Sequence, residues 1–164
     1  MARKVVLADA SPLIGLARVG ALPWLRKLYR TISITKAVRV ETTGARELPG
    51  AVALTAALKQ GWIRVLPKEW REPPLPQLDA GEASTLRAAI ALGPGVLVLL
   101  DDLQARREAQ RLGIAMTGTA GTIVVARRAG LIPAARPVFS RLAEVGFHLS
   151  EDLLQGILVE LGED

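Results

Sequence analysis

The chain has 164 residues, of which 50% are hydrophobic, and its 21 Lys and Arg residues against 16 Asp and Glu residues give a net charge of +5. This length and composition predict a single folded domain and exclude an intrinsically disordered chain. The absence of cysteine excludes disulfides, thiolate zinc sites, iron–sulfur clusters and a cysteine nucleophile. The single histidine, His148, excludes a metal site built from several histidines. Any metal bound by this chain would therefore depend on oxygen ligands.

The hydrophobic segments are too short or too rich in glycine to cross a membrane, which takes about 20 consecutive apolar residues. The N-terminus passes from Arg3 and Lys4 through only four apolar residues to Asp9, which is too short for a secretory signal. We therefore expect a cytoplasmic protein.

The first half of the chain alternates short apolar segments with helix-forming segments. The Val-rich segment 4–8 is typical of a buried strand. Ser11 followed by Pro12 predicts that a helix begins there, with the hydroxyl as its cap. The other segments expected in this half are strands over 32–34 and 62–66 and helices over 24–29, 35–42 and 51–60.

A proline-rich loop separates the two halves, with four prolines between residues 67 and 76. Neither half is large enough to fold alone, so we interpret residues 67–77 as a surface excursion within one domain. The segments expected after it are helices over 79–92, 102–112, 119–129 and 135–145, strands over 96–100 and 114–116, and a last helix that begins at Ser150. Strands that alternate with helices predict an α/β fold, a three-layer α/β/α sandwich with a mainly parallel central sheet.

Acidic residues follow predicted strands, begin a predicted helix or, in the case of Glu41, lie within the helix after the second strand. The residues in question are Asp9, Glu41, Asp79, Glu82, Asp101 and Asp102. In open parallel sheets, ligands bind beyond the carboxyl ends of the strands. Carboxylates that share one crevice repel each other unless a cation lies between them. Because Mg²⁺ and Mn²⁺ prefer oxygen ligands, the pattern is compatible with a site for either ion.

Each of these acids also has a purely structural explanation. Asp79 and Glu82 have the spacing of a capping box, in which two residues cap a helix reciprocally. Asp9 and Asp102 occupy positions where acidic N-caps are common, and Glu41 could form a surface ion pair. The sequence leaves both interpretations open.

Other motifs give weaker signals. No phosphate-binding P-loop motif is present. The glycine-rich segment 118–122 precedes a predicted helix, so it could bind an anion through backbone amides, as in a nucleotide-binding α/β protein. Aromatic residues make up 4% of the chain, which predicts little recognition of bases by stacking.

An ordered set of segments resembles the PIN-domain nucleases, in particular the prokaryotic branch related to the VapC toxins. The resemblance covers nearly the whole chain and rests on residues 7–14 (LADASPLI), 37–41 (AVRVE), 78–83 (LDAGEA), 99–106 (LLDDLQAR), 113–114 (GI) and 118–121 (GTAG). It implies an α/β/α sandwich in which an acidic quartet binds one or two Mg²⁺ or Mn²⁺ ions.

Carried over by position, the resemblance assigns roles to individual residues. The implied catalytic residues are Asp9, Glu41, Glu82 and Asp102, and the implied metal ligands are Asp9, Glu82, Asp101 and Asp102. In this assignment Glu41 orients water or acts as a general base, Ser11 contacts metal-bound water and Thr119 is a polar residue near the site.

The substrate side of the hypothesis depends on the basic residues. Of the 21 cationic residues, 16 are arginine, which binds phosphate in bidentate fashion. Arg106 and Arg107 follow the acidic pair and are candidates for phosphate contacts. The resemblance implies an endoribonuclease that hydrolyses RNA phosphodiester bonds, a homodimer, and a toxin paired with an antitoxin protein. The alternative is a catalytically weak PIN-like module that binds RNA or protein.

Overall fold

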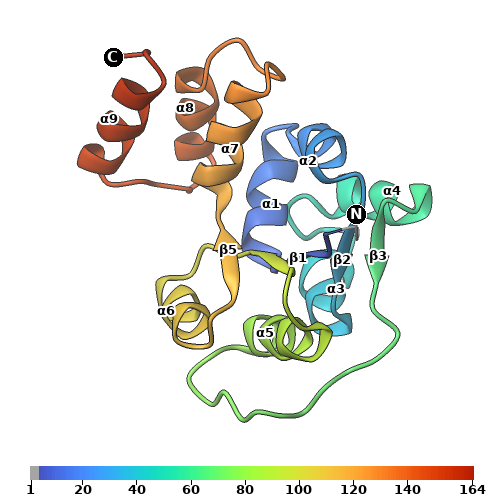
Figure 1. Cartoon of the computed structure of the whole chain (residues 1–164). Helices are drawn as coiled ribbons and strands as arrows, with labels where there is room; N and C mark the ends of the chain where they lie inside the picture. The colour runs from blue at the N-terminus through green and yellow to red at the C-terminus, as the bar shows by residue number, and fades with distance from the viewer. Residues whose placement is uncertain (1–3) are drawn as a thin grey trace.

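A computed structural model describes residues 4–164 of the chain (Figure 1). Within these residues, five strands form one parallel sheet in the order β3-β2-β1-β4-β5. The strands are β1 (Val6–Ala8), β2 (Ile32–Ile34), β3 (Ile63–Val65), β4 (Leu97–Leu99) and β5 (Ala115–Thr117). Strand order reverses between β1 and β4, and in doubly wound sheets ligands bind at such a reversal.

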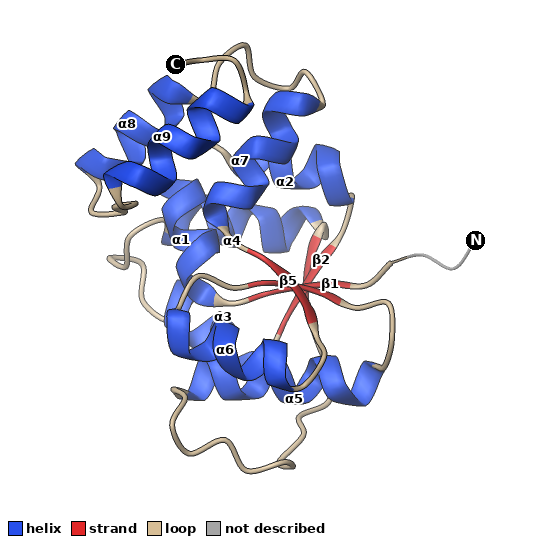
Figure 2. Ribbon diagram, turned by 60° about the vertical axis from the view of Figure 1, so that its left-hand side comes forward, coloured by secondary structure: helices blue, strands red, loops and turns tan. Residues whose placement is uncertain are grey.

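Helices cover both faces of the sheet, which confirms the predicted three-layer α/β/α fold. In Figure 2, α5 and α6 lie on one side of the strands, and α1, α2, α7, α8 and α9 lie on the other. The helices in the described residues are α1 (Ala10–Arg18), α2 (Leu22–Tyr29), α3 (Lys36–Thr43), α4 (Ala51–Gln60), α5 (Ala80–Leu92), α6 (Leu103–Arg111), α7 (Thr119–Arg128), α8 (Arg136–Glu144) and α9 (Glu151–Glu160).

The alternation of side chains along the central strands supplies two hydrophobic cores. Val6 and Ala8 of β1 pack into the core beneath α1 and α2, whereas Leu7 packs into the core beneath α5 and α6. β4 follows the same rule, since Leu99 joins the first core and Val98 joins the second. Because both faces are buried, these strands are continuously apolar, as is usual for a parallel sheet.

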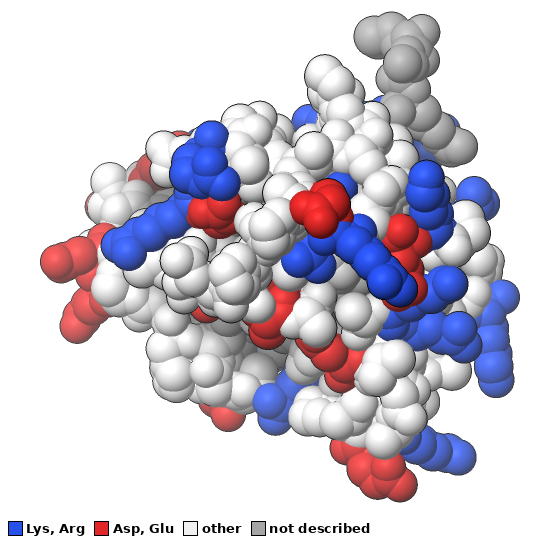
Figure 3. All heavy atoms as spheres, turned by 90° about the horizontal axis from the view of Figure 1, so that it is seen from below, with Lys and Arg blue, Asp and Glu red and all other residues white. Residues whose placement is uncertain are grey.

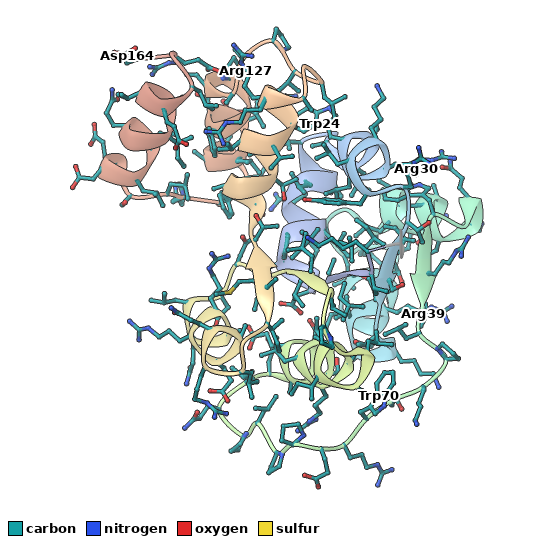
Figure 4. All side chains as sticks on the ribbon, in the orientation of Figure 1. Trp24, Arg30, Arg39, Trp70, Arg127 and Asp164 are labelled. Atoms are coloured by element: carbon teal, nitrogen blue, oxygen red, sulfur yellow. The ribbon has the colours of Figure 1, made fainter. Side chains whose placement is uncertain are left out.

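The proline-rich segment 67–77 packs against α5 through several contacts. Leu75 is buried and Trp70 is partly buried against the α5–α6 core, and Figure 4 shows Trp70 beside α5. Arg87 Nε of α5 donates a 2.8 Å hydrogen bond to the carbonyl of Pro73. These contacts fix the loop that leads into α5.

The C-terminal segment is tied back onto the helices that precede it. Leu158 of α9 is buried, and Ser150 caps this helix by accepting a hydrogen bond from the amide of Leu153, as predicted. The carboxylate of Glu163 accepts hydrogen bonds from Arg127 and from the backbone amide of Ala135 at the start of α8. Figure 4 shows Arg127 on the side of the molecule where the chain ends.

One predicted helix start is wrong. α1 begins at Ala10 instead of after Ser11, and Asp9 occupies the N-cap position. Pro12 therefore stands at the third helical position, which it tolerates because backbone N–H groups in the first turn have no partner within the helix.

None of the helices among residues 4–164 combines the length and the apolar character needed to span a membrane.

Candidate functional site

A cavity of about 340 Å³ opens beyond the carboxyl end of β1 and is lined by acidic side chains from three helices. The carboxylates that line it are Asp9, Glu41, Asp79 and Glu82, and Ser11 and Arg18 of α1 also contribute. Figure 3 views the molecule from below in Figure 1, and acidic side chains are visible in the recessed middle of that face. The structure thus brings together three of the four predicted catalytic acids, although they lie far apart in the sequence.

Asp9 is the most deeply buried acid of the cavity, with only 4% of its surface exposed. Its backbone amide donates a 3.0 Å hydrogen bond to Leu99 of β4, which fixes its position at the strand reversal. Although Asp9 stands at the N-cap of α1, its side chain makes no capping hydrogen bond, and Oδ1 is buried without a hydrogen-bond partner among residues 4–164. The structural explanation of this residue as a cap therefore fails.

The surroundings of Asp9 disfavour its charged form. Burial, together with the negative charges of Asp79, Glu82 and Glu41, raises the pKa of Asp9 to about 7, and the backbone amide of Ala10 only partly opposes this. A buried carboxylate with an unpaired oxygen is unfavourable unless a proton or a cation compensates for it. This side chain is accordingly suited to bind a cation.

Glu41 reaches the cavity from α3, where its carboxylate lies against the start of α5. A Cβ atom at Gly81 would stand 2.5 Å from Glu41 Oε1, so a larger residue fits at this position only if the Glu41 carboxylate moves away. Burial and the charge of Asp79 raise the pKa of Glu41, while the backbone amide of Gly81 lowers it. Gly81 thus allows α5 to approach Glu41 closely.

Asp79 and Glu82 form the predicted capping box at the start of α5. The amide of Glu82 donates to Asp79 Oδ1 at 2.8 Å, and the amide of Asp79 donates to Glu82 Oε2 at 3.1 Å. Burial raises the pKa of Glu82, as do the charges of Asp79, Asp102 and Glu41, and the amide of Asp79 acts in the opposite direction. The two interpretations of the sequence are therefore compatible, because these caps also line the cavity.

Asp101 lies outside the cavity and is engaged with α7. Its Oδ1 accepts a 2.8 Å hydrogen bond from the amide of Thr119, and its Oδ2 accepts a 2.6 Å bond from Thr119 Oγ1. Arg106 Nη1 donates to the carbonyl of Leu100 beside it. An aspartate thus occupies the anion position at the start of α7, which argues against a nucleotide site at segment 118–122.

Asp102 caps α6, since its Oδ1 accepts a 2.9 Å hydrogen bond from the amide of Ala105. It is exposed and lines a neighbouring cavity together with Arg107 and Gln77. Its charge nevertheless contributes to the raised pKa of Glu82. Asp102 therefore lies beside the acidic cavity, within its electrostatic reach.

Asp79, Arg18 and Phe147 also line the cavity, although the family resemblance implied no role for any of them. Arg18 Nη1 donates a 2.8 Å hydrogen bond to the carbonyl of Val145, in the turn between α8 and α9. Asp79 could have been inferred from its position beside Glu82. Arg18 and Phe147 come together only in the folded chain, and no local sequence pattern indicates that they line the cavity.

The donor set fits a hard divalent cation, although the side chains are not drawn together around one point. Within residues 4–164, no group of three or more Asp, Glu or His side chains is close enough to form a ready-made ion site. The cavity nonetheless presents carboxylate oxygens from four side chains, including the unpaired Oδ1 of Asp9, together with the hydroxyl of Ser11. Such oxygens are the ligands that Mg²⁺ and Mn²⁺ prefer.

Comparison with known protein families gives one result that covers nearly the whole chain. Residues 5–163 match the family described as PIN domain (DUF3368). No individual curated protein matches the sequence significantly.

Proposed function

The chain belongs to the PIN-domain family, whose members are generally nucleases, and on that basis we propose that it is a divalent-metal-dependent endoribonuclease. The observation that carries the proposal is the buried, unpaired Oδ1 of Asp9 in a cavity lined by three further carboxylates. Mg²⁺ or Mn²⁺ is the proposed cofactor. RNA as the substrate follows the PIN-nuclease resemblance, and the net charge of +5 is favourable for any polyanion.

Each polar residue of the cavity has a separate role in the proposed reaction. Asp9 and Glu82 would hold the ion, with Asp102 as a further ligand from the adjacent cap. When bound, a divalent ion lowers the pKa of water and neutralises charge on a scissile phosphate. Glu41 would accept the proton of the attacking water, because its raised pKa makes it a better base than an ordinary surface glutamate. Ser11, which also lines the cavity, would position that water.

We assign different roles to Arg106, Arg107 and Asp101. Arg107 is exposed next to Asp102, where it would bind the phosphate backbone beyond the cleaved bond. Arg106 donates to a backbone carbonyl, and Asp101 bonds to Thr119, so we assign these two residues to holding the carboxyl end of β4 in place.

Metal dependence tests the proposal. Purified protein should cleave single-stranded RNA with Mg²⁺ or Mn²⁺, lose the activity in EDTA, and regain it when the ion is restored. A DNA oligonucleotide of the same sequence should be cleaved less well. Cleavage that persists in EDTA would overturn the proposal.

The engaged caps Asp79, Glu82 and Asp102 favour one alternative, a PIN-like module that binds RNA or protein without cleaving it. In that case the acids would serve only to cap helices. RNA binding by pure protein that shows no cleavage with any divalent ion would support this alternative.

Gly81→Ala should separate catalysis from folding. The new Cβ would displace the Glu41 carboxylate, so we expect kcat to fall about 10-fold or more if Glu41 is the base. The unfolding free energy should change by no more than about 1 kcal/mol, because alanine favours helix and a flexible side chain can move aside. Gly156→Ala in α9, where a Cβ meets nothing within 4 Å, is the matched control. Unchanged kcat in Gly81→Ala would remove Glu41 from the mechanism.

We also propose that this nuclease acts as the toxin of a toxin–antitoxin pair, as a homodimer that an antitoxin protein inhibits. Expression of the chain alone in a bacterial host should then arrest growth, and Asp9→Asn should grow normally at the same protein level. Equal growth with both proteins would contradict the toxin role and leave the nuclease proposal in place.

A further inference from the structure

Among the described residues, Phe147 is the only aromatic residue that lines the acidic cavity. It is half-buried, since it also packs against the main hydrophobic core. It belongs to the turn between α8 and α9, which runs along the lower ends of these two helices in Figure 1. An apolar ring therefore borders a cavity that is otherwise rich in charge.

The backbone on which Phe147 stands is firmly held. Its amide donates a 2.9 Å hydrogen bond to Leu142, and the amide of Gly146 donates to Ala143 at 3.1 Å. Gly146 has φ +92, a left-handed conformation that glycine adopts without strain. Arg18 holds the same turn from α1 through the carbonyl of Val145. The ring is thus supported from two directions and would lose little conformational freedom on contact with a ligand.

The charges around the ring indicate where a nucleotide would lie. Arg18 lines the same cavity and forms no salt bridge within the part of the chain that the structure describes. Its single hydrogen bond to Val145 leaves other guanidinium N–H groups for a phosphate oxygen. The cavity thus combines an arginine able to bind phosphate, an apolar ring and four acids.

The cavity volume sets the size of the ligand. About 340 Å³ lies at the lower end of the range for small-molecule sites, which matches a single nucleotide in size. Proteins that recognise single-stranded RNA stack unpaired bases on aromatic side chains.

We propose that Phe147 and Arg18 form a nucleotide subsite, in which Phe147 stacks on one unpaired base and Arg18 binds an adjacent phosphate. This subsite rests on the proposed nuclease function and makes single-stranded RNA its substrate. Although the low aromatic content predicts little stacking overall, this one ring is placed where it selects an unpaired nucleotide next to the acids.

Binding in EDTA tests the subsite without cleavage. The probe is a fluorescein-labelled single-stranded RNA, together with versions that each carry one abasic nucleotide at successive positions. Phe147→Leu should weaken binding of the intact RNA about 5- to 50-fold, the size expected for one lost stack, whereas Phe147→Tyr should bind like the wild type. At one position of the RNA, the abasic nucleotide should weaken binding by the wild-type protein by this same factor. At that position it should not weaken binding by Phe147→Leu any further.

Two results would overturn the subsite. One is a Kd for Phe147→Leu within twofold of the wild-type value. The other is that Phe147→Leu binds every abasic RNA more weakly than the wild type by the same factor. Such a loss would not depend on any one base and would indicate a structural role of the ring. Leu153→Ala, at an exposed position on α9, is the control for nonspecific effects. Cleavage with Mn²⁺ is measured separately, so its absence would count against the nuclease proposal and leave the stacking result to be judged by Kd.

Discussion

Asp9→Asn should abolish metal-dependent RNA cleavage, with a loss of at least about 100-fold, because even outer residues of metal sites commonly contribute 10- to 100-fold. Asparagine keeps the size of the side chain but removes the charge that would attract a cation. The measurement is the initial rate of RNA cleavage at saturating Mn²⁺. Asp152→Asn, at an exposed acid on α9, is the matched control and should cleave at the wild-type rate.

The same variant should be more stable than the wild type when no divalent ion is present. With a pKa of about 7 in the folded protein against 3.8 ordinarily, Asp9 keeps a proton between these values that the unfolded chain releases. Folding stability of the wild type therefore falls as the pH rises from about 4 to 7. Asparagine removes this loss, so in EDTA at pH 8 the unfolding free energy of Asp9→Asn should be higher by on the order of 4 kcal/mol.

Urea denaturation in EDTA at pH 5 and pH 8 measures this effect, since the gain should be smaller at the lower pH. A variant that cleaves normally would contradict the nuclease proposal. A variant that is destabilised at pH 8 would instead show that the charged Asp9 carboxylate stabilises the fold.

Asp101→Ala should destabilise the protein strongly, by about 2–4 kcal/mol. Both oxygens of Asp101 bond to Thr119, and hydrogen bonds to a charged group contribute about 1.5–3 kcal/mol each, with incomplete additivity. Asp102→Ala removes only the cap of α6 and should cost about 1 kcal/mol. Urea denaturation in EDTA gives both values without interference from bound metal.

A double-mutant cycle with Thr119→Val identifies the interaction responsible. A coupling free energy of about 1–2 kcal/mol between Asp101 and Thr119 is the expected result. If Asp101→Ala lost activity but not stability, Asp101 would be a metal ligand, contrary to the assignment made from its hydrogen bonds.

The sequence was sufficient to predict the layered fold and the location of the acids. Continuous apolar strands such as Val96–Leu100 indicate burial on both faces of a sheet, and the alternation with helices makes that sheet parallel. The acids at strand ends then share one edge by geometry. This geometry applies to Asp9 and to the Asp101–Asp102 pair, whereas Glu41 and Glu82 lie within helices and were assigned to the site by the family resemblance.

Other features depended on contacts that no local pattern encodes. Two adjacent acids end β4, and only the position of Thr119 across the sheet edge shows that Asp101 is the one engaged with α7. The hydrogen bond from Arg18 to Val145 joins residues 127 positions apart. Phe147 reaches the cavity through that same turn, so its place could not be inferred before α8 was seen to pack beside α1.

Crystals grown with Mn²⁺ would show whether a divalent ion binds in the acidic cavity beside Asp9. Anomalous difference density collected near the manganese absorption edge should show a peak in contact with a carboxylate oxygen of Asp9, and the peak should vanish in Asp9→Asn. Absence of any peak in this cavity at millimolar Mn²⁺, or a peak that persists in the variant, would contradict metal binding by Asp9.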